Sequence, residues 1–288
     1  MTDNMNIQWY PGHMTKTRRQ IETDLKLVDA VCEIVDARIP VSSRNPDIDA
    51  ICGEKPRMIV LNRMDLADPA ATKKWAEYFR RKGMAVIATD CKSKKGISAF
   101  TPAARLACAE KLERDAKRGM NRPLRVMVVG IPNVGKSTLI NQISGRKSAK
   151  AENRPGVTRG KQWVTVDSGL QLLDTPGILW PKFEDPEVGM MLAYTGAVKE
   201  GVIDLEELAY RLMELLHKFY PQTLLERYKV EAPEGTPGWQ LLEMAGKKRG
   251  YLVSGGEVNT ERMAKVLLDE FRSGKLGNFT LEMPEDMV

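Results

Sequence analysis

The sequence has few features of secreted or membrane-embedded proteins. No stretch of its 288 residues approaches the roughly 18 consecutive apolar residues that cross a bilayer. No basic start followed by an apolar region marks a signal peptide. The four cysteines include no C-x-x-C pair, which argues against a zinc site and against a disulfide framework. We therefore expect reduced, packed cysteines in a cytoplasmic protein that binds no membrane.

The charge is distributed unevenly along the chain. Residues 1–182 carry 32 Lys and Arg against 19 Asp and Glu, whereas residues 183–288 carry 12 against 19. A strongly basic first part indicates a polyanionic partner, of which nucleic acid is the commonest. A solvated charged surface explains the charge alone equally well. The hydrophobic content of 42% is enough to build a full core in one large domain or two ordinary ones.

The segment 130–138 fits the pattern G-x-x-x-x-G-K-[ST] of a P-loop. Residues 124–129 before it have the composition of a buried strand, and residues 136–144 after it are typical of a helix. The N-terminus of such a helix favours phosphate, and the lysine of the pattern reaches the β- and γ-phosphates. The expected nucleotide contacts are Asn133, Val134, Gly135, Lys136, Ser137 and Thr138.

Apolar runs and helical patterns alternate through the first two thirds of the chain. Strands are expected at 30–35, 57–61 and 85–88, with a long helix over 97–118 and a hairpin over 162–173. This alternation predicts an α/β fold whose sheet is mostly parallel and has helices on both faces.

Near residues 181–186 the pattern becomes purely helical. Helices are expected near 186–199, 205–219, 222–229, 237–247 and 260–272. We therefore predict a domain over 1–185, which includes an N-terminal arm, and a small all-α domain over 186–288. The acidic tail 280–288 is expected to fray.

Two further segments have the chemistry of a nucleotide site. Asp174 ends a predicted strand, as a Mg²⁺-binding aspartate of a P-loop protein does, and the Gly177 amide is placed to meet the γ-phosphate. Thr158 lies between the P-loop and Asp174, within Pro-Gly-Val-Thr, and is a candidate for a second Mg²⁺-binding hydroxyl beside Ser137. A plain loop threonine is the alternative for Thr158.

The segment Asn62-Arg63-Met64-Asp65 resembles the guanine-reading N-K-x-D motif. The Asp65 carboxylate can accept hydrogen bonds from N1–H and the 2-amino group of guanine, donors that adenine lacks. Asn62 can brace the P-loop, and Arg63 replaces the usual lysine. Cys91, Lys92 and Ser93 lie where a backbone amide would meet guanine O6.

The base-reading motifs precede the P-loop here, whereas ordinary GTPases have the reverse order. Loops at the carboxyl ends of parallel strands form one site wherever the chain is cut, so this order predicts a circular permutation. The strand that ends at Asp174 then leads directly into the helical domain.

With these motifs, the chain resembles the circularly permuted P-loop GTPase family over nearly its whole length. Further matching stretches are 9–14, 36–40, 174–179, 254–257 and 271–277. The resemblance implies GTP hydrolysis to GDP and a late step in assembling the large ribosomal subunit, stimulated by that particle. It also implies that the helical domain contacts ribosomal RNA, and no DNA partner is expected. The absence of a C-terminal Cys/His cluster argues against the zinc-containing, small-subunit branch.

Ile178 occupies the position of the water-positioning glutamine of Ras-like enzymes, and an aliphatic side chain cannot orient water. His13 is the candidate replacement, because imidazole can orient water near neutral pH. The alternative is that His13 only packs the N-terminal turn.

The resemblance implies that Asn133 helps to bind K⁺. An RNA-binding assembly factor gated by nucleotide without catalysis is the alternative function, and a nucleotide kinase is disfavoured by the Asn62/Asp65 pair.

Overall fold

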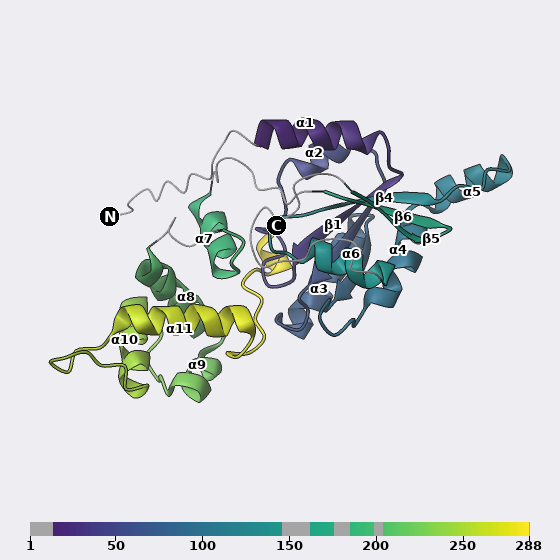
Figure 1. The fold of residues 1–288 in the computed structure, drawn as a ribbon. Coiled ribbons are helices and arrows are strands. Elements are labelled where there is room, and N and C mark those ends of the chain that lie inside the picture. Colours follow the sequence, from purple (N-terminus) through teal and green to yellow (C-terminus); the bar gives the residue numbers. More distant parts are fainter. Residues whose placement is uncertain (1–13, 146–161, 176–184, 199–203, 288) are drawn as a thin grey trace. The chain divides into compact units, whose positions relative to one another are not determined.

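The computed structural model describes residues 14–145, 162–175, 185–198 and 204–287 (Figure 1). Contacts between Cα atoms divide the chain into two units. One comprises residues 9–182 together with 282–288, and the other includes 183–281. The chain thus enters the second unit a few residues before the predicted boundary at 185 and returns to the first unit for its last residues. Among the described helices, none is both long and apolar enough to cross a membrane.

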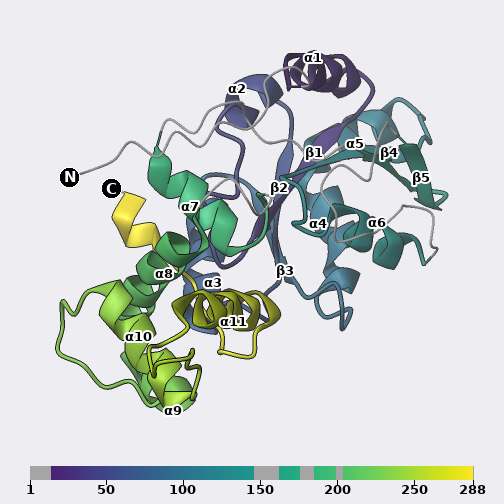
Figure 2. The ribbon, with the colours of Figure 1, turned by 60° about the vertical axis from the view of Figure 1, so that its left-hand side comes forward.

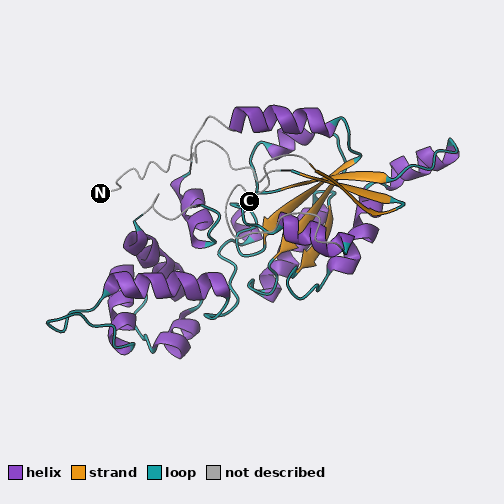
Figure 3. Ribbon diagram, in the orientation of Figure 1, coloured by secondary structure: helices purple, strands orange, loops and turns teal. Residues whose placement is uncertain are grey.

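The first unit is built on a six-stranded sheet with the order β3-β2-β1-β4-β6-β5. Figure 3 shows the strands of this sheet and the helices around them. Neighbouring strands are parallel except for β5, which pairs antiparallel with β6 at one edge. The predicted mostly parallel sheet is therefore confirmed. The strands are β1 (Ala30–Asp36), β2 (Arg57–Asn62), β3 (Ala85–Thr89), β4 (Leu124–Val129), β5 (Gln162–Asp167) and β6 (Leu170–Asp174).

Helices cover both faces of this sheet because its central strand is apolar on both sides. All seven residues of β1 are buried. Val31 packs with α1 (Met14–Leu25) and α2 (Ile48–Cys52), and Val35, on the same face of β1, packs with α3 (Pro69–Arg81). Figure 2 shows α4 (Phe100–Ala107) and α6 (Lys136–Ser144) on the opposite face. The four cysteines are free and buried, as expected.

The prediction of one long helix over 97–118 is wrong. The structure has a short 3₁₀ turn followed by α4, and then a separate helix, α5 (Ala109–Lys117). The interruption lies at Cys108, which is buried and has left the helical backbone conformation at φ −110° and ψ 17°. Phe100 and Ala104 of α4 are fully buried, whereas α5 buries none of its residues. The break therefore separates a helix that packs on the sheet from one that leaves it.

The described part of the second unit is built from helices packed on an apolar core, some of them capped by polar side chains. Asp204 and Asn259 cap two of them, each accepting hydrogen bonds from first-turn amides. Leu212, Leu216 and Leu241 are fully buried and form part of the apolar core. The helices are α7 (Pro186–Tyr194), α8 (Leu205–Phe219), α9 (Pro221–Tyr228), α10 (Gly238–Lys248) and α11 (Thr260–Ser273).

The acidic C-terminal tail is anchored on the first unit, contrary to the expectation that it frays. The Glu282 carboxylate accepts hydrogen bonds from the backbone amides of Val41 and Ser42, at 2.6 and 3.0 Å. The indole of the fully buried Trp75 donates to the Glu282 carbonyl at 2.8 Å. These contacts join residues more than 200 positions apart, so no local sequence signal predicts them.

Replacing Glu282 by alanine is expected to destabilise the first unit by about 2 kcal/mol, because two partly buried amides lose their acceptor. Urea unfolding will measure this loss, and hydrogen exchange at Val41 and Ser42 should become faster. Glu285→Ala is the matched control, since its ion pair with Lys74 is exposed and should not change stability measurably. Equal stability of the two variants would contradict a structural role for Glu282.

Candidate nucleotide site

The P-loop follows β4 and is shaped by two close backbone approaches. A Cβ on Gly130 would lie 2.6 Å from the carbonyl oxygen of Ile34, and one on Gly135 would lie 2.4 Å from Nδ2 of Asn62. Gly135 also has φ 105°, a conformation that L side chains rarely adopt. Only glycine therefore fits at either position. The predicted strand–loop–helix context of the P-loop is present, with α6 beginning at Lys136.

Lys136 and Asp174 are the buried charges of the site. The Lys136 ammonium donates to the carbonyls of Gly130 and Ile131 at 3.1 and 2.8 Å. Burial lowers the pKa of Lys136 to about 8, and Asp174 opposes this shift. Burial raises the pKa of Asp174 to about 6, against the influence of Lys136 and of the Thr175 amide. At pH 7 both side chains are therefore mostly charged, which suits binding of phosphate and of a cation.

The surroundings of Asp174 fit a divalent cation. Its Oδ1 atom is buried and has no hydrogen-bond partner among the described residues. A buried carboxylate oxygen without a donor is costly unless a cation completes its shell. Thr175 fixes the end of β6, since its hydroxyl donates to the Val128 carbonyl at 2.7 Å. Asp174 is thus held beside the P-loop strand with one oxygen available.

Asn62, in the predicted base-reading motif, joins the end of β2 to the P-loop. Its Nδ2 donates to the Val134 carbonyl at 2.7 Å, while its Oδ1 accepts from the Thr89 hydroxyl and the Cys91 thiol, each at 3.0 Å. A carbonyl can only accept and a hydroxyl can donate, so the three partners fix the orientation of the amide. Thr89 is fully buried. It is a positioning residue that the motif alone does not reveal.

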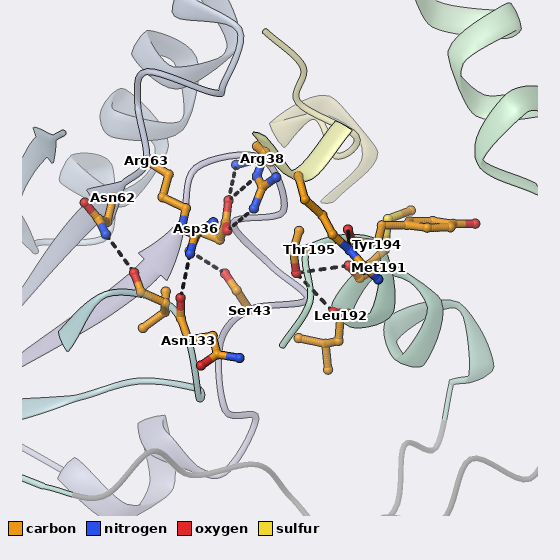
Figure 4. A network of polar contacts seen from close by, with 12 residues as sticks. Asp36, Arg38, Ser43, Asn62, Arg63, Asn133, Met191, Leu192, Tyr194 and Thr195 are labelled. Atoms are coloured by element: carbon orange, nitrogen blue, oxygen red, sulfur yellow. Dashed lines mark hydrogen bonds and ion pairs between the residues drawn. The ribbon is translucent and has the colours of Figure 1, made fainter. Parts of the chain in front are cut away.

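Arg63 makes a second contact from the same motif. Its guanidinium donates to the Asn133 carbonyl at 2.9 Å, next to the carbonyl that Asn62 holds (Figure 4). Both Arg63 and Asn133 have positive φ, at 62° and 60°. Burial lowers the pKa of Arg63, although Asp36 opposes the shift. Arg63 is thus hydrogen-bonded to the P-loop backbone, although the motif usually has lysine at this position.

The predicted base-reading residues lie at the ends of neighbouring strands. Asp65 is exposed three residues after the end of β2, and the Met64 amide donates to the Thr89 carbonyl at the end of β3. Lys92 and Ser93 are exposed, and the Lys92 amide donates to the Asp90 carboxylate at 2.8 Å. The two segments lie at the same edge of the sheet as the P-loop, because β2, β3 and β4 are parallel members of one sheet.

A buried ion pair stiffens the loop after β1. Arg38 is fully buried, and its backbone amide, Nε and Nη2 all donate to Asp36, at 2.8 to 3.0 Å (Figure 4). Burial raises the pKa of Asp36, but the Arg38 guanidinium more than offsets this and holds it below the usual value. The Asp36 amide donates to the Ser43 hydroxyl at 2.9 Å. The sequence contains this pair within Asp-Ala-Arg-Ile-Pro, but no motif chemistry assigns it a role.

Ser137 and Thr138 lie in the first turn of α6, and four other residues named in the predictions lie outside the described part of the chain. These four are His13, Thr158, Gly177 and Ile178. Their proposed roles therefore stay predictions.

Replacing Thr89 by valine should weaken guanine-nucleotide binding about fivefold to tenfold. Valine keeps the volume but removes one of the donors that orient the Asn62 amide, a loss of about 1 kcal/mol. Titration with a fluorescent GDP analogue will measure the affinity. Cys91→Ser keeps a donor at the neighbouring position and serves as the control. Parental affinity in the valine variant would show that Thr89 does not position Asn62.

Comparisons with known proteins agree with this geometry. Residues 125–222 match a family model described as a 50S ribosome-binding GTPase. The chain is 46% identical to the ribosome biogenesis GTPase A of Bacillus cereus, covering 98% of the chain and 95% of that protein. It is 33% identical to the protein of the same name from Thermotoga maritima, covering 98% and 96%. It is 35% identical to the mitochondrial ribosome-associated GTPase 1 of Xenopus tropicalis, covering 95% and 94%.

Solved structures show the same fold. The GDP-bound structure of TM YlqF aligns with a TM-score of 0.68 and 29% identity, covering 93% of this chain and all of that one. The GNP-bound structure of YlqF from T. maritima aligns with a TM-score of 0.63 and 28% identity, covering 94% and 99%. The chain therefore belongs to the ribosome biogenesis GTPase A family and is a GTPase with a circularly permuted P-loop fold.

Proposed function

We propose that this GTPase acts late in the maturation of the large ribosomal subunit and that the ribosomal particle stimulates its GTP hydrolysis. The proposal rests on the hydrogen bonds that Asn62 and Arg63 donate to two consecutive P-loop carbonyls. Guanine recognition and phosphate binding then share one rigid element, as a nucleotide-dependent switch requires. The names of the relatives and of the matching family model support a ribosomal partner.

The residues present fit a bound Mg²⁺. Asp174 offers its buried, unpartnered oxygen, and Ser137, at the start of α6, and Thr158 would add hydroxyls. Bound Mg²⁺ neutralises charge that develops on the phosphates. The Lys136 ammonium, which lies against the carbonyls of Gly130 and Ile131, would neutralise part of the same phosphate charge. Asn133 would help to bind K⁺ beside the phosphates.

We assign the positioning of the attacking water to His13. The aliphatic Ile178 cannot do this, and an imidazole near its neutral form can accept a hydrogen bond from water.

We further propose that the helical domain over 186–288 contacts ribosomal RNA and that the protein works in the cytoplasm, where GTP and maturing particles are present. The region is acidic as a whole, so such a contact needs a local basic patch. Lys247 and Lys248, which are exposed in the last turn of α10, form one, whereas the neighbouring Arg249 is half-buried and donates to Glu270. The nucleotide state could be passed to this domain because the strand that ends at Asp174 leads directly into it.

The replacement Asp65→Asn should lower GTP affinity about 100-fold, because a carboxylate that accepts two hydrogen bonds becomes an amide that also donates. Affinity for xanthosine triphosphate should rise, since its 2-oxo group accepts where guanine donates. Competition binding with GTP, ATP and xanthosine triphosphate measures both effects. Asp68→Asn, three residues away at the start of α3, controls for loss of an acidic group. Equal binding of ATP and GTP by the parent would refute guanine recognition.

GTP turnover should rise about 10²-fold with large ribosomal subunits and stay at its basal rate with small subunits or with neither. His13→Ala should keep nucleotide affinity and lose this stimulation. The other histidine of the chain, His217, lies in the helical unit, and His217→Ala provides the matched control. Full turnover without any particle would refute stimulation, and a fully stimulated His13→Ala variant would remove His13 from the mechanism.

A further inference from the structure

The edge of the sheet opposite the nucleotide site has a projecting basic element. The amino ends of the parallel strands lie at this edge, and α5 with the following residues 118–123 leads into β4 there. Figure 1 shows α5 extending away from the sheet. We call residues 109–122 the basic arm. No residue of α5 is buried, so this helix does not stabilise the first unit by burying its own apolar side chains.

Ion pairs with buried or half-buried acids hold the arm in place. Asp29, which is 6% exposed, accepts from Lys111 at 2.6 Å and from Arg122 at 3.2 Å, and Arg122 also pairs with Asp115. The Arg125 amide donates to the other Asp29 oxygen at 2.9 Å. One carboxylate thus fixes α5, the segment after it and the start of β4. A helix fixed in this way presents its outer face at low entropic cost.

The outer face of the arm has basic side chains without acidic partners. Arg114, Lys117 and Arg118 are spaced i, i+3 and i+4, which places them on one helical face, and all three are exposed. None of them forms an ion pair with any residue of the described ranges. Basic residues in a last turn also complement the helix dipole, but that effect needs no such exposed cluster.

A second feature lies on β4, which follows the arm, and on the antiparallel β5, where Trp163 pairs with Leu173 of β6. Arg125, near the start of β4, is exposed, and its guanidinium lies 5.4 Å from the centroid of the Trp163 ring on β5. Trp163 is 38% exposed, and Arg125 also donates to Gln171 on β6 at 3.2 Å. An exposed aromatic ring beside an arginine is the arrangement on which unpaired nucleic-acid bases stack. The side chains of Arg125 and Trp163 take no part in the ion pairs that hold the arm.

We propose that the basic arm, with Arg125 and Trp163, binds the phosphate backbone of RNA, and that this contact lies on the unit that hydrolyses GTP. The proposal rests on the ribosomal function proposed above and adds a second RNA surface to the one assigned to the helical domain. Guanidinium groups match phosphate oxygens in geometry. A membrane-surface helix would need large apolar residues opposite its charges, and α5 has a single leucine, Leu112.

The test compares two variants that each lose three positive charges from the full-length protein. The arm variant is Arg114→Gln/Lys117→Gln/Arg118→Gln. The control is Lys73→Gln/Arg80→Gln/Arg81→Gln, on the exposed side of α3 in the same unit. Binding to protein-free large-subunit ribosomal RNA is measured across a salt series. We expect the arm variant to bind about tenfold or more weakly at low salt, with the slope of log K against log salt reduced by about 2.

The control should bind like the parent, and both variants should keep the parental unfolding midpoint and the basal GTP turnover without RNA. A parental slope and affinity in the arm variant would overturn the assignment, as would an equal loss in both variants. Trp163→Leu gives a second, charge-neutral readout, with weaker binding to single-stranded RNA and unchanged salt slope expected. If the parent binds RNA and is stimulated by large subunits while the arm variant is unaffected, only the arm proposal fails.

Discussion

The hydrogen bond from the Asn62 amide to the Val134 carbonyl is the contact on which the nucleotide site depends. At 2.7 Å it ties the end of β2 to the P-loop that follows β4, although β1 lies between these strands in the sheet. The bond leaves no room for a side chain at position 135, which is why the second P-loop glycine is required there. Thr89 and Cys91 hold the other end of the same amide, so β3 also takes part.

This arrangement explains how a permuted chain keeps a working GTPase site. The site is formed by loops at one edge of a parallel sheet, and their order along the chain does not affect their positions. The permutation changes which helix or strand follows each loop along the chain. The strand of Asp174 now precedes the helical unit, and the chain returns from that unit at Glu282 to the loop after β1. That loop also contains the Asp36–Arg38 pair, so both ends of the helical unit connect to segments near the nucleotide site.

The two edges of the sheet differ in chemistry. The carboxyl edge has buried charges, such as Lys136 and Asp174, whose pKa values are shifted by burial. The amino edge has exposed basic groups that form no ion pair with any described residue, on a helix none of whose own residues is buried. Buried charges favour a small ligand with defined geometry, whereas exposed ones favour an extended polyanion. RNA bound to the basic arm would lie at the end of the parallel strands opposite the buried charges of the nucleotide site.

The sequence by itself determined the P-loop, the mostly parallel sheet and the helical second part, because each depends on local spacing and periodicity. It did not determine the break at Cys108, since both halves of 97–118 have helical periodicity and only packing on the sheet separates them. Thr89 as a clamp for Asn62, Glu282 as an anchor and Asp29 as the support of the basic arm were decided only by the tertiary structure. Each is a polar side chain whose partner is distant in sequence, and no local pattern specifies which distant backbone or charge it will meet.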